Sequence, residues 1–264
     1  MESQLAEFYI GHAVAWSLVF IRVLGLTMFA PLMSGTTLPR QFSVLFAAMF
    51  AVAVYAMMPP EARQPPPMTM HALAIAALSE VLIGAGIGLI AGLPLIAVEI
   101  AGQIIGYQLG FSVAQAANPG LDINLDAIGT MLFYIAVAIF VSMGGLEHTF
   151  LALIDTFGRV PVGGLAFADA PVTAYTEALL AATELAVRIA APAAGVGLMA
   201  LLGLAFIMRT MPQLNVLTIS FPLKILIGVV ATVFALTAIS DAIADAVKMA
   251  IDAAAAWARG IGAA

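Results

Sequence analysis

The sequence has few charged residues and no cysteine. Only 9% of its 264 residues are charged and 63% are apolar, whereas a soluble domain has about 25% charged and about 45–50% apolar residues. So few polar residues cannot cover the surface of a soluble core of this size, and the composition therefore predicts a membrane protein. Without cysteine the chain has no disulfide, no thiolate metal ligand and no cysteine nucleophile.

Basic residues are also scarce. Nine Lys and Arg stand against 15 Asp and Glu, which gives a net charge of −6. Because no basic patch is available to neutralise phosphates, nucleic acid is excluded as a partner. Glu2 and Glu7 precede the first apolar run where a cleavable signal peptide carries Lys or Arg, so we expect that run to be retained.

Catalytic and cofactor motifs are missing as well. GAGIG at Gly84–Gly88 fits neither the P-loop nor the dinucleotide-binding pattern, and there is no G-x-S-x-G for a serine hydrolase. Glu147 and His148 are adjacent and diverge on a helix, so they do not predict a metal site. The sequence therefore predicts no enzyme, no cofactor and no metal.

Apolar segments of about membrane-spanning length fill most of the chain. They predict an all-α membrane protein of about six long helices arranged as hairpins. The segments lie at about residues 10–30, 42–58, 71–109 with a kink at Pro94, 127–143, 172–208 and 217–239. Too few Lys and Arg flank them to set the orientation of the termini.

We expect a single membrane domain over residues 1–264. Its predicted parts are N-terminal helices (1–58), a proline-rich loop (59–70), a glycine-rich hairpin with its following loop (71–126), a helix and loop that includes a short amphipathic element (127–171), a C-terminal hairpin (172–239) and an amphipathic C-terminal helix (240–264).

Glycines repeat every four residues in the third segment. Gly84, Gly88 and Gly92 form one series, and Gly102 and Gly106 with Gly110 form the next. This spacing places each series on one helical face and lets another backbone approach closely. It predicts tight helix packing and says nothing of catalysis.

Isolated charges inside the apolar segments are candidates for function. They are Arg22, Glu80, Glu99, Arg188, Arg209 and Lys224. The alternative is that they lie near helix ends or form structural pairs between helices. Both interpretations stay open for Glu80 and Arg209, and the structural one is favoured for Arg22, Glu99 and Arg188.

The segment RTMPQLNVLTISFPLK, residues 209–224, is the main polar interruption in the second half. Pro212 and Pro222 predict a break between two helices. Gln213 and Asn215 can donate to the carbonyls freed there, and the cations Arg209 and Lys224 at its two ends can cap helices or contact a neighbouring subunit. A plain loop at the membrane surface explains the prolines equally well.

Three blocks together resemble the FliR family of flagellar export-gate proteins, whose injectisome relatives are the SctT proteins. They are RVLGLTMFAPLMSGTTLPRQ (residues 22–41), SEVLIGAGIG with EIAGQIIGYQLGFSVAQAANPG (within residues 79–120) and RTMPQLNVLTISFPLKILIG (residues 209–228). The resemblance covers nearly the whole chain in the expected order.

The resemblance implies a non-enzymatic subunit of the type III export gate of the flagellar basal body in the bacterial inner membrane. Such a subunit joins a helical assembly with FliP, FliQ and FlhB, in contact with membrane lipid, that forms the pore for unfolded flagellar substrates. By the same resemblance, residues 110–122 form a pore plug centred on Gly110, Phe111, Ser112, Asn118 and Pro119.

Two other functions are compatible with the residues alone. One is a small-solute or ion secondary transporter that uses Glu80 and Arg209 at broken helices. The other is a purely structural scaffold. The sequence does not decide between a flagellar and an injectisome system, and it gives neither stoichiometry nor the depth of the assembled helices.

Overall fold

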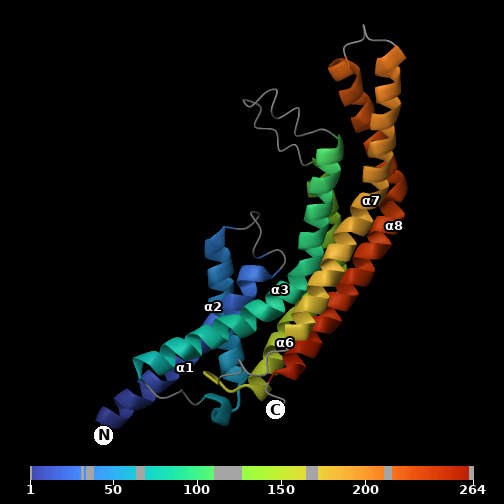
Figure 1. Cartoon of the computed structure of the whole chain (residues 1–264). Helices are drawn as coiled ribbons and strands as arrows, with labels where there is room; N and C mark the ends of the chain where they lie inside the picture. Colours follow the sequence, from blue (N-terminus) through green and yellow to red (C-terminus); the bar gives the residue numbers. More distant parts are fainter. Residues whose placement is uncertain are drawn as a thin grey trace. The chain divides into compact units, whose positions relative to one another are not determined.

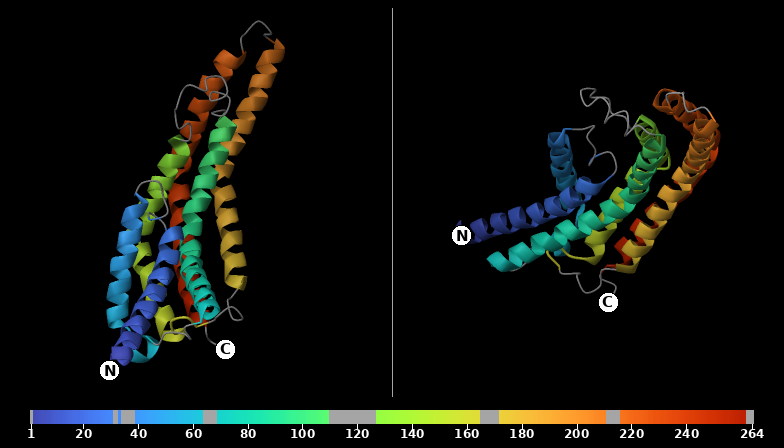
Figure 2. Two further views of the ribbon diagram at one scale, coloured as in Figure 1. Left: turned by 90° about the vertical axis from the view of Figure 1, so that its left-hand side faces the viewer. Right: turned by 45° about the horizontal axis from the view of Figure 1, so that its top comes forward.

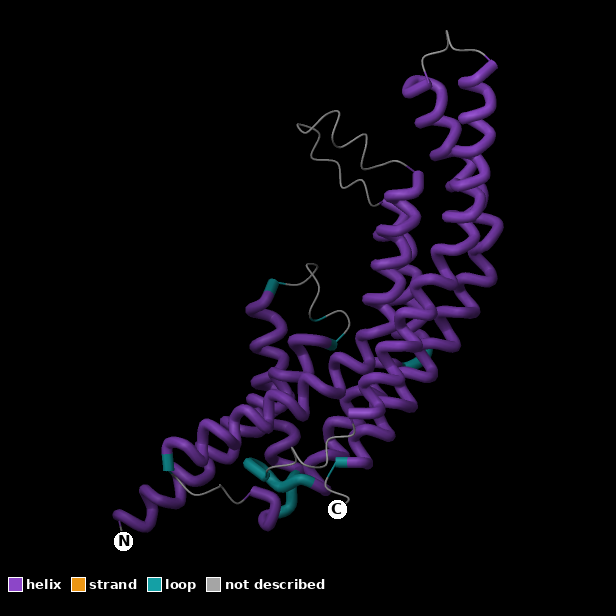
Figure 3. The backbone as a smooth tube through the Cα atoms, viewed as in Figure 1, coloured by secondary structure: helices purple, strands orange, loops and turns teal. Residues whose placement is uncertain are grey.

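The structure is a computed structural model that describes residues 2–30, 33, 39–63, 69–109, 127–164, 172–210 and 216–261. Within these residues all regular structure is helical and no strand occurs, as Figure 3 shows. The predicted all-α class is confirmed. The predicted plug (residues 110–122) and the residues Pro212, Gln213 and Asn215 lie outside the described part.

The described residues form seven α-helices and one 3₁₀ turn (Figure 1). Their bounds are α1 Glu2–Phe29, α2 Arg40–Met57, η1 Pro60–Arg63, α3 Met70–Leu109, α5 Ala127–Ser142, α6 Gly145–Arg159, α7 Val172–Thr210 and α8 Val216–Gly260. All six predicted apolar segments are therefore helical, and α6 is the short amphipathic element expected after the fourth. The amphipathic C-terminal segment is continuous with the last apolar one in α8.

Four of the described helices are long and apolar enough to cross a membrane. They lie within Phe8–Phe29, Met70–Leu109, Val172–Ile207 and Pro222–Gly260. The count becomes five if Ile128–Ser142 and Gly145–Arg159, which meet at 59°, form one broken span. The number is lower than six because α2 has 18 residues and α5 has 16, and about 20 are needed for a full crossing.

The chain divides into two compact units. Unit 1 contains residues 1–93, 141–179 and 248–264, and unit 2 contains residues 94–140 and 180–247. Helices α3, α7 and α8 contribute to both units, and Pro94 is the first residue of α3 that belongs to unit 2. The prediction of one membrane domain stays a prediction.

In unit 1, α1 contacts α2 and crosses the first part of α3. Its core joins apolar side chains of α1, α2, α3, α6 and the end of α8, among them Val23, Ile87, Leu153 and Trp257. Since these elements come from three separate parts of the sequence, the core holds the two ends of the chain together with its middle.

Glycines make the contact between α1 and α3 close. A Cβ atom added at Gly25 of α1 would lie 2.6 Å from the carbonyl oxygen of Val81, and one at Gly88 would lie 2.5 Å from that of Leu26. A Cβ atom at Gly84 would overlap the backbone of Arg22. The backbones of the two helices therefore touch over about two turns, which only residues without a side chain allow.

In unit 2, the second part of α3 packs in the same way against α5. A Cβ atom at Gly102 would overlap the backbone of Gly129, while Gly106 is buried. The orange parts of helices α7 and α8 lie side by side at the top of both views of Figure 2. On α8, Gly228 faces the side chain of Leu109 at the last residue of α3.

Candidate functional site

A fully buried ion pair joins α1 to α3 in unit 1. The side chains of Arg22 and Glu80 are both 0% exposed. The Nε of Arg22 donates to Oε2 of Glu80, and Nη2 donates to Oε1 at 3.1 Å. This bidentate geometry is the strongest form of an arginine–carboxylate contact.

Helix α6 and the turn after it complete the coordination of both charges. Nη1 of Arg22 donates to Oγ1 of Thr156 at 3.1 Å, and Nη2 donates to the carbonyl oxygen of Val160 at 3.3 Å. The guanidinium lies 4.1 Å from the ring centre of Phe157. On the other side, the backbone N–H of Gly163 donates to Oε1 of Glu80 at 2.8 Å.

The sequence explains why these groups converge. Gly84, four residues after Glu80, brings α3 against the backbone of α1 at Arg22, so the two charges face each other one turn from the closest contact. An isolated charge in this apolar interior would be very unfavourable. Every side-chain nitrogen of Arg22 and both oxygens of Glu80 have a hydrogen-bond partner inside the protein, so the cluster is a structural centre that joins α1, α3 and α6.

Glu80 was predicted as a buried charge or subunit contact; its side chain is 0% exposed, and its role stays a prediction. Both of its oxygens are used by Arg22 and Gly163, so nothing in its geometry favours a substrate-binding carboxylate or the transporter hypothesis. The pairing of Arg22 with Glu80 was not predicted from the sequence. The available signal was that two lone charges of opposite sign lie in the first and third apolar segments, each within about one helical turn of a glycine that permits close packing.

The other predicted charges are not buried in the chain. Glu99 and Arg188 are exposed, Arg209 is exposed in the last turn of α7 and Lys224 is half-buried in α8. None of these residues forms an ion pair with another described residue. In a membrane protein, such groups face lipid headgroups, water or another subunit.

One expectation for the 209–224 segment is wrong. Helix α7 ends at Thr210 and α8 begins at Val216, so Pro222 lies inside α8 and does not break the helix as expected. Pro222 follows the first turns of α8, where it removes a single i to i−4 hydrogen bond. Neighbouring helices and local backbone adjustment can tolerate such a loss in a membrane helix.

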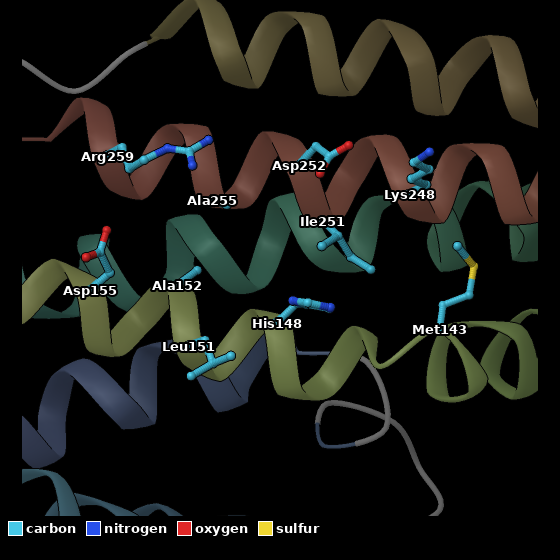
Figure 4. A pocket seen from close by; sticks show the side chains of 10 residues that line it. All are labelled: Met143, His148, Leu151, Ala152, Asp155, Lys248, Ile251, Asp252, Ala255 and Arg259. Atoms are coloured by element: carbon cyan, nitrogen blue, oxygen red, sulfur yellow. The ribbon is translucent and has the colours of Figure 1, made fainter.

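A groove with mixed charge lies between α6 and the end of α8 in unit 1 (Figure 4). Its volume is about 470 Å³, and it is lined by Met143, His148, Leu151, Ala152, Asp155, Lys248, Ile251, Asp252, Ala255 and Arg259. Asp155 and Arg259 lie at one end, and Met143 and Lys248 lie at the other. Asp155 pairs with Arg159 at 3.1 Å on the exposed face of α6.

The groove carries no metal-binding cluster. No group of three or more His, Asp or Glu able to hold a metal ion occurs among the described residues. Lys248, Asp252 and Arg259 make no ion pair with a described residue. The groove therefore offers both signs of charge to a contacting molecule.

These features define an all-α, multi-pass membrane protein whose buried polar centre is structural. The sequence profile of the bacterial export proteins, family 1, matches residues 13–250. The chain belongs to this family, and the resemblance seen in its sequence blocks is confirmed.

Similar proteins come from flagellar and from injectisome systems. The chain is 29% identical to the flagellar biosynthetic protein FliR of Escherichia coli over 209 residues, 79% of each chain. It is 26% identical to FliR of Bacillus subtilis over 243 residues, 90% of this chain and 92% of the relative. It is 32% identical to the Yop proteins translocation protein T of Yersinia pestis over 151 residues, 55% and 56% of the two chains.

Proposed function

We propose that this chain is a subunit of a flagellar type III protein export apparatus in the bacterial inner membrane. The observation that carries the proposal is the family match over residues 13–250. A flagellar system is favoured over an injectisome because the flagellar relatives from E. coli and B. subtilis match 79% and 90% of the chain, whereas the Yersinia relative matches 55%.

The uncovered surfaces of the long helices support an assembled state. Each long helix contains an apolar stretch of 18 residues. Other parts of the chain bury 72% of this stretch in Met70–Leu109, but only 28% of the stretch in Val172–Ile207 and 17% of the stretch in Pro222–Gly260. Large apolar side chains such as Met199, Phe206 and Phe234 are therefore exposed on α7 and α8. In a subunit of a helical assembly, neighbouring helices cover such faces.

The partners in this proposal are FliP, FliQ and FlhB. Together with them the chain forms the pore through which unfolded flagellar substrates pass. We assign contact with a partner subunit to the exposed Arg209, to Lys224 and to the nearby Pro212, Gln213 and Asn215. Arg209 is well suited to this role because its guanidinium has no ion-pair partner among the described residues. A guanidinium can bind a carboxylate through two parallel hydrogen bonds.

The plug belongs to the same proposal. Gly102 holds the second part of α3 against the backbone of Gly129 in α5, which fixes the end of α3 from which residues 110–122 continue. A short segment held at its base can close a pore by weak contacts that a passing chain displaces. Gly110, Phe111, Ser112, Asn118 and Pro119 are the residues assigned to it.

Removing the plug should make the membrane leaky. We expect replacement of residues 110–122 by a Gly-Ser linker of equal length to leave assembly intact and to raise ion conductance by about tenfold or more, because a flexible polar linker cannot exclude ions and water. Conductance is measured in planar bilayers with the assembled complex.

A matched control replaces residues 64–67 of the proline-rich loop in the same way. This variant should conduct like the unmodified complex. Equal conductance of the plug variant and the unmodified complex, with assembly retained, would show that residues 110–122 are not the plug.

A further inference from the structure

The last turn of α3 is enclosed by two other helices of unit 2. Gln108 and Leu109 are the final residues of α3, and residues 110–122, which the proposed function assigns to the plug, follow directly in the sequence. Each of the two side chains meets a glycine, Gly197 of α7 or Gly228 of α8. All four residues belong to unit 2.

Leu109 fills the space that Gly228 leaves by having no side chain. A Cβ atom added at Gly228 would overlap Cδ2 of Leu109 and would lie 2.9 Å from both Cδ1 and Cγ. Leu109 is 0% exposed, and Gly228 is buried as well. The branched end of the leucine is therefore enclosed on α8 and cannot turn aside into solvent.

The neighbouring Gln108 meets α7 in the same way. A Cβ atom added at Gly197 would lie 2.8 Å from Cγ of Gln108, and Nε2 of Gln108 donates to the carbonyl oxygen of Ala194 at 3.5 Å. Two consecutive residues of α3 thus reach two different helices, each at a buried glycine. The pair Gly197 and Gly228 is called the glycine socket.

Other glycines of α7 lack this environment. A Cβ atom added at Gly195 or Gly203 would have nothing within 4 Å, and both residues are exposed. Close approach of α3 therefore accounts for glycine at residues 197 and 228, and Gly195, two residues from Gly197, provides a matched control on the same helix.

We propose that the glycine socket sets the position of the plug. This inference rests on the proposed function. Leu109 is fixed in the socket, and each further residue extends the chain by at most about 3.6 Å, so residues 110–122 start from a defined point. Helices α7 and α8 thereby hold the base of the plug, and Gly197 and Gly228 are positioning residues.

Gly228→Ala is expected to make the assembled complex leaky. The added methyl group displaces Leu109 and with it the base of the plug. Conductance in planar bilayers should rise by about fivefold or more, toward that of the complex in which a Gly-Ser linker replaces residues 110–122. Gly195→Ala should conduct like the unmodified complex.

A compensating change tests whether the effect passes through Leu109. The three atoms nearest to the added Cβ all belong to the side chain of Leu109, and Leu109→Ala removes them. In the Leu109→Ala background, Gly228→Ala should therefore add no further conductance. The double variant also keeps the test decisive if Gly228→Ala alone does not assemble. An equal rise in both backgrounds would overturn the proposal.

Amide hydrogen exchange separates failure of the socket from failure of the plug. We expect exchange at residues 105–109 to become about tenfold faster in Gly228→Ala and to stay unchanged in Gly195→Ala. Unchanged exchange or unchanged conductance in Gly228→Ala, while the linker variant leaks, would overturn the socket and leave the plug assignment standing. A linker variant that does not leak would overturn the plug, and with it the role of the socket, whatever the exchange.

Discussion

Glu80→Gln is expected to lower the free energy of unfolding by about 3–5 kcal/mol, the usual cost of breaking a buried ion pair from one side. The substitution keeps the shape of the side chain but leaves the charge of Arg22, which is 0% exposed, without its counter-ion. It also weakens the acceptor for the N–H of Gly163. The loss is measured by equilibrium unfolding in detergent micelles, followed by the fluorescence of Trp16 and Trp257, which both lie in unit 1.

Removing both charges should be far less harmful than removing one. The double variant Arg22→Met with Glu80→Leu is expected to recover most of the lost stability, because apolar residues of similar volume need no compensation in this core. Arg159→Ala is the control. Its pair with Asp155 is 40% and 51% exposed, and such surface pairs contribute about 0–1 kcal/mol. An effect of Glu80→Gln no larger than that of Arg159→Ala would show that the buried cluster is not a structural centre.

Gly84→Ala is expected to destabilise unit 1 by about 1–3 kcal/mol, as overpacking of a tight core does. The added methyl group would overlap the backbone of Arg22, and backbone cannot move aside as the end of a flexible side chain can. The helices would have to separate, which would also disturb the bidentate contact between Arg22 and Glu80. The same unfolding experiment measures the loss.

Gly158→Ala on α6, in the same unit, is the matched control, because nothing lies within 4 Å of the added methyl group. Alanine is a better helix former than glycine, so this change should leave stability unaltered or raise it by about 0.5–1 kcal/mol. If both substitutions shift stability equally, glycine at residue 84 acts through helix propensity and not through close packing with α1.

The helices could be predicted from the sequence because hydropathy and length are local properties. The segments at residues 71–109 and 172–208 became α3 and α7 with bounds within about two residues, within the usual uncertainty of helix ends. Pro222 was wrongly expected to break the helix. A proline inside a membrane helix is tolerated when its surroundings compensate for the lost hydrogen bond.

The buried site could be predicted only in part. Arg22 and Glu80 are recognisable as charges in apolar segments, but they are 58 residues apart in the sequence. Their pairing depends on the crossing of α1 and α3. The roles of Thr156, Val160 and Gly163 depend on where α6 ends and how the chain turns afterwards. No spacing rule in the sequence contains that information.

Copurification tests the central claim most directly. The tagged full-length chain is expressed in a flagellated host lacking its own FliR, extracted in mild detergent and analysed by mass spectrometry. We expect FliP and FliQ to be recovered with it, and we expect Arg209→Ala and Gln213→Ala to reduce that recovery by about tenfold, as the loss of a charged or buried interface contact does. Recovery of a stable chain without either protein would contradict the account.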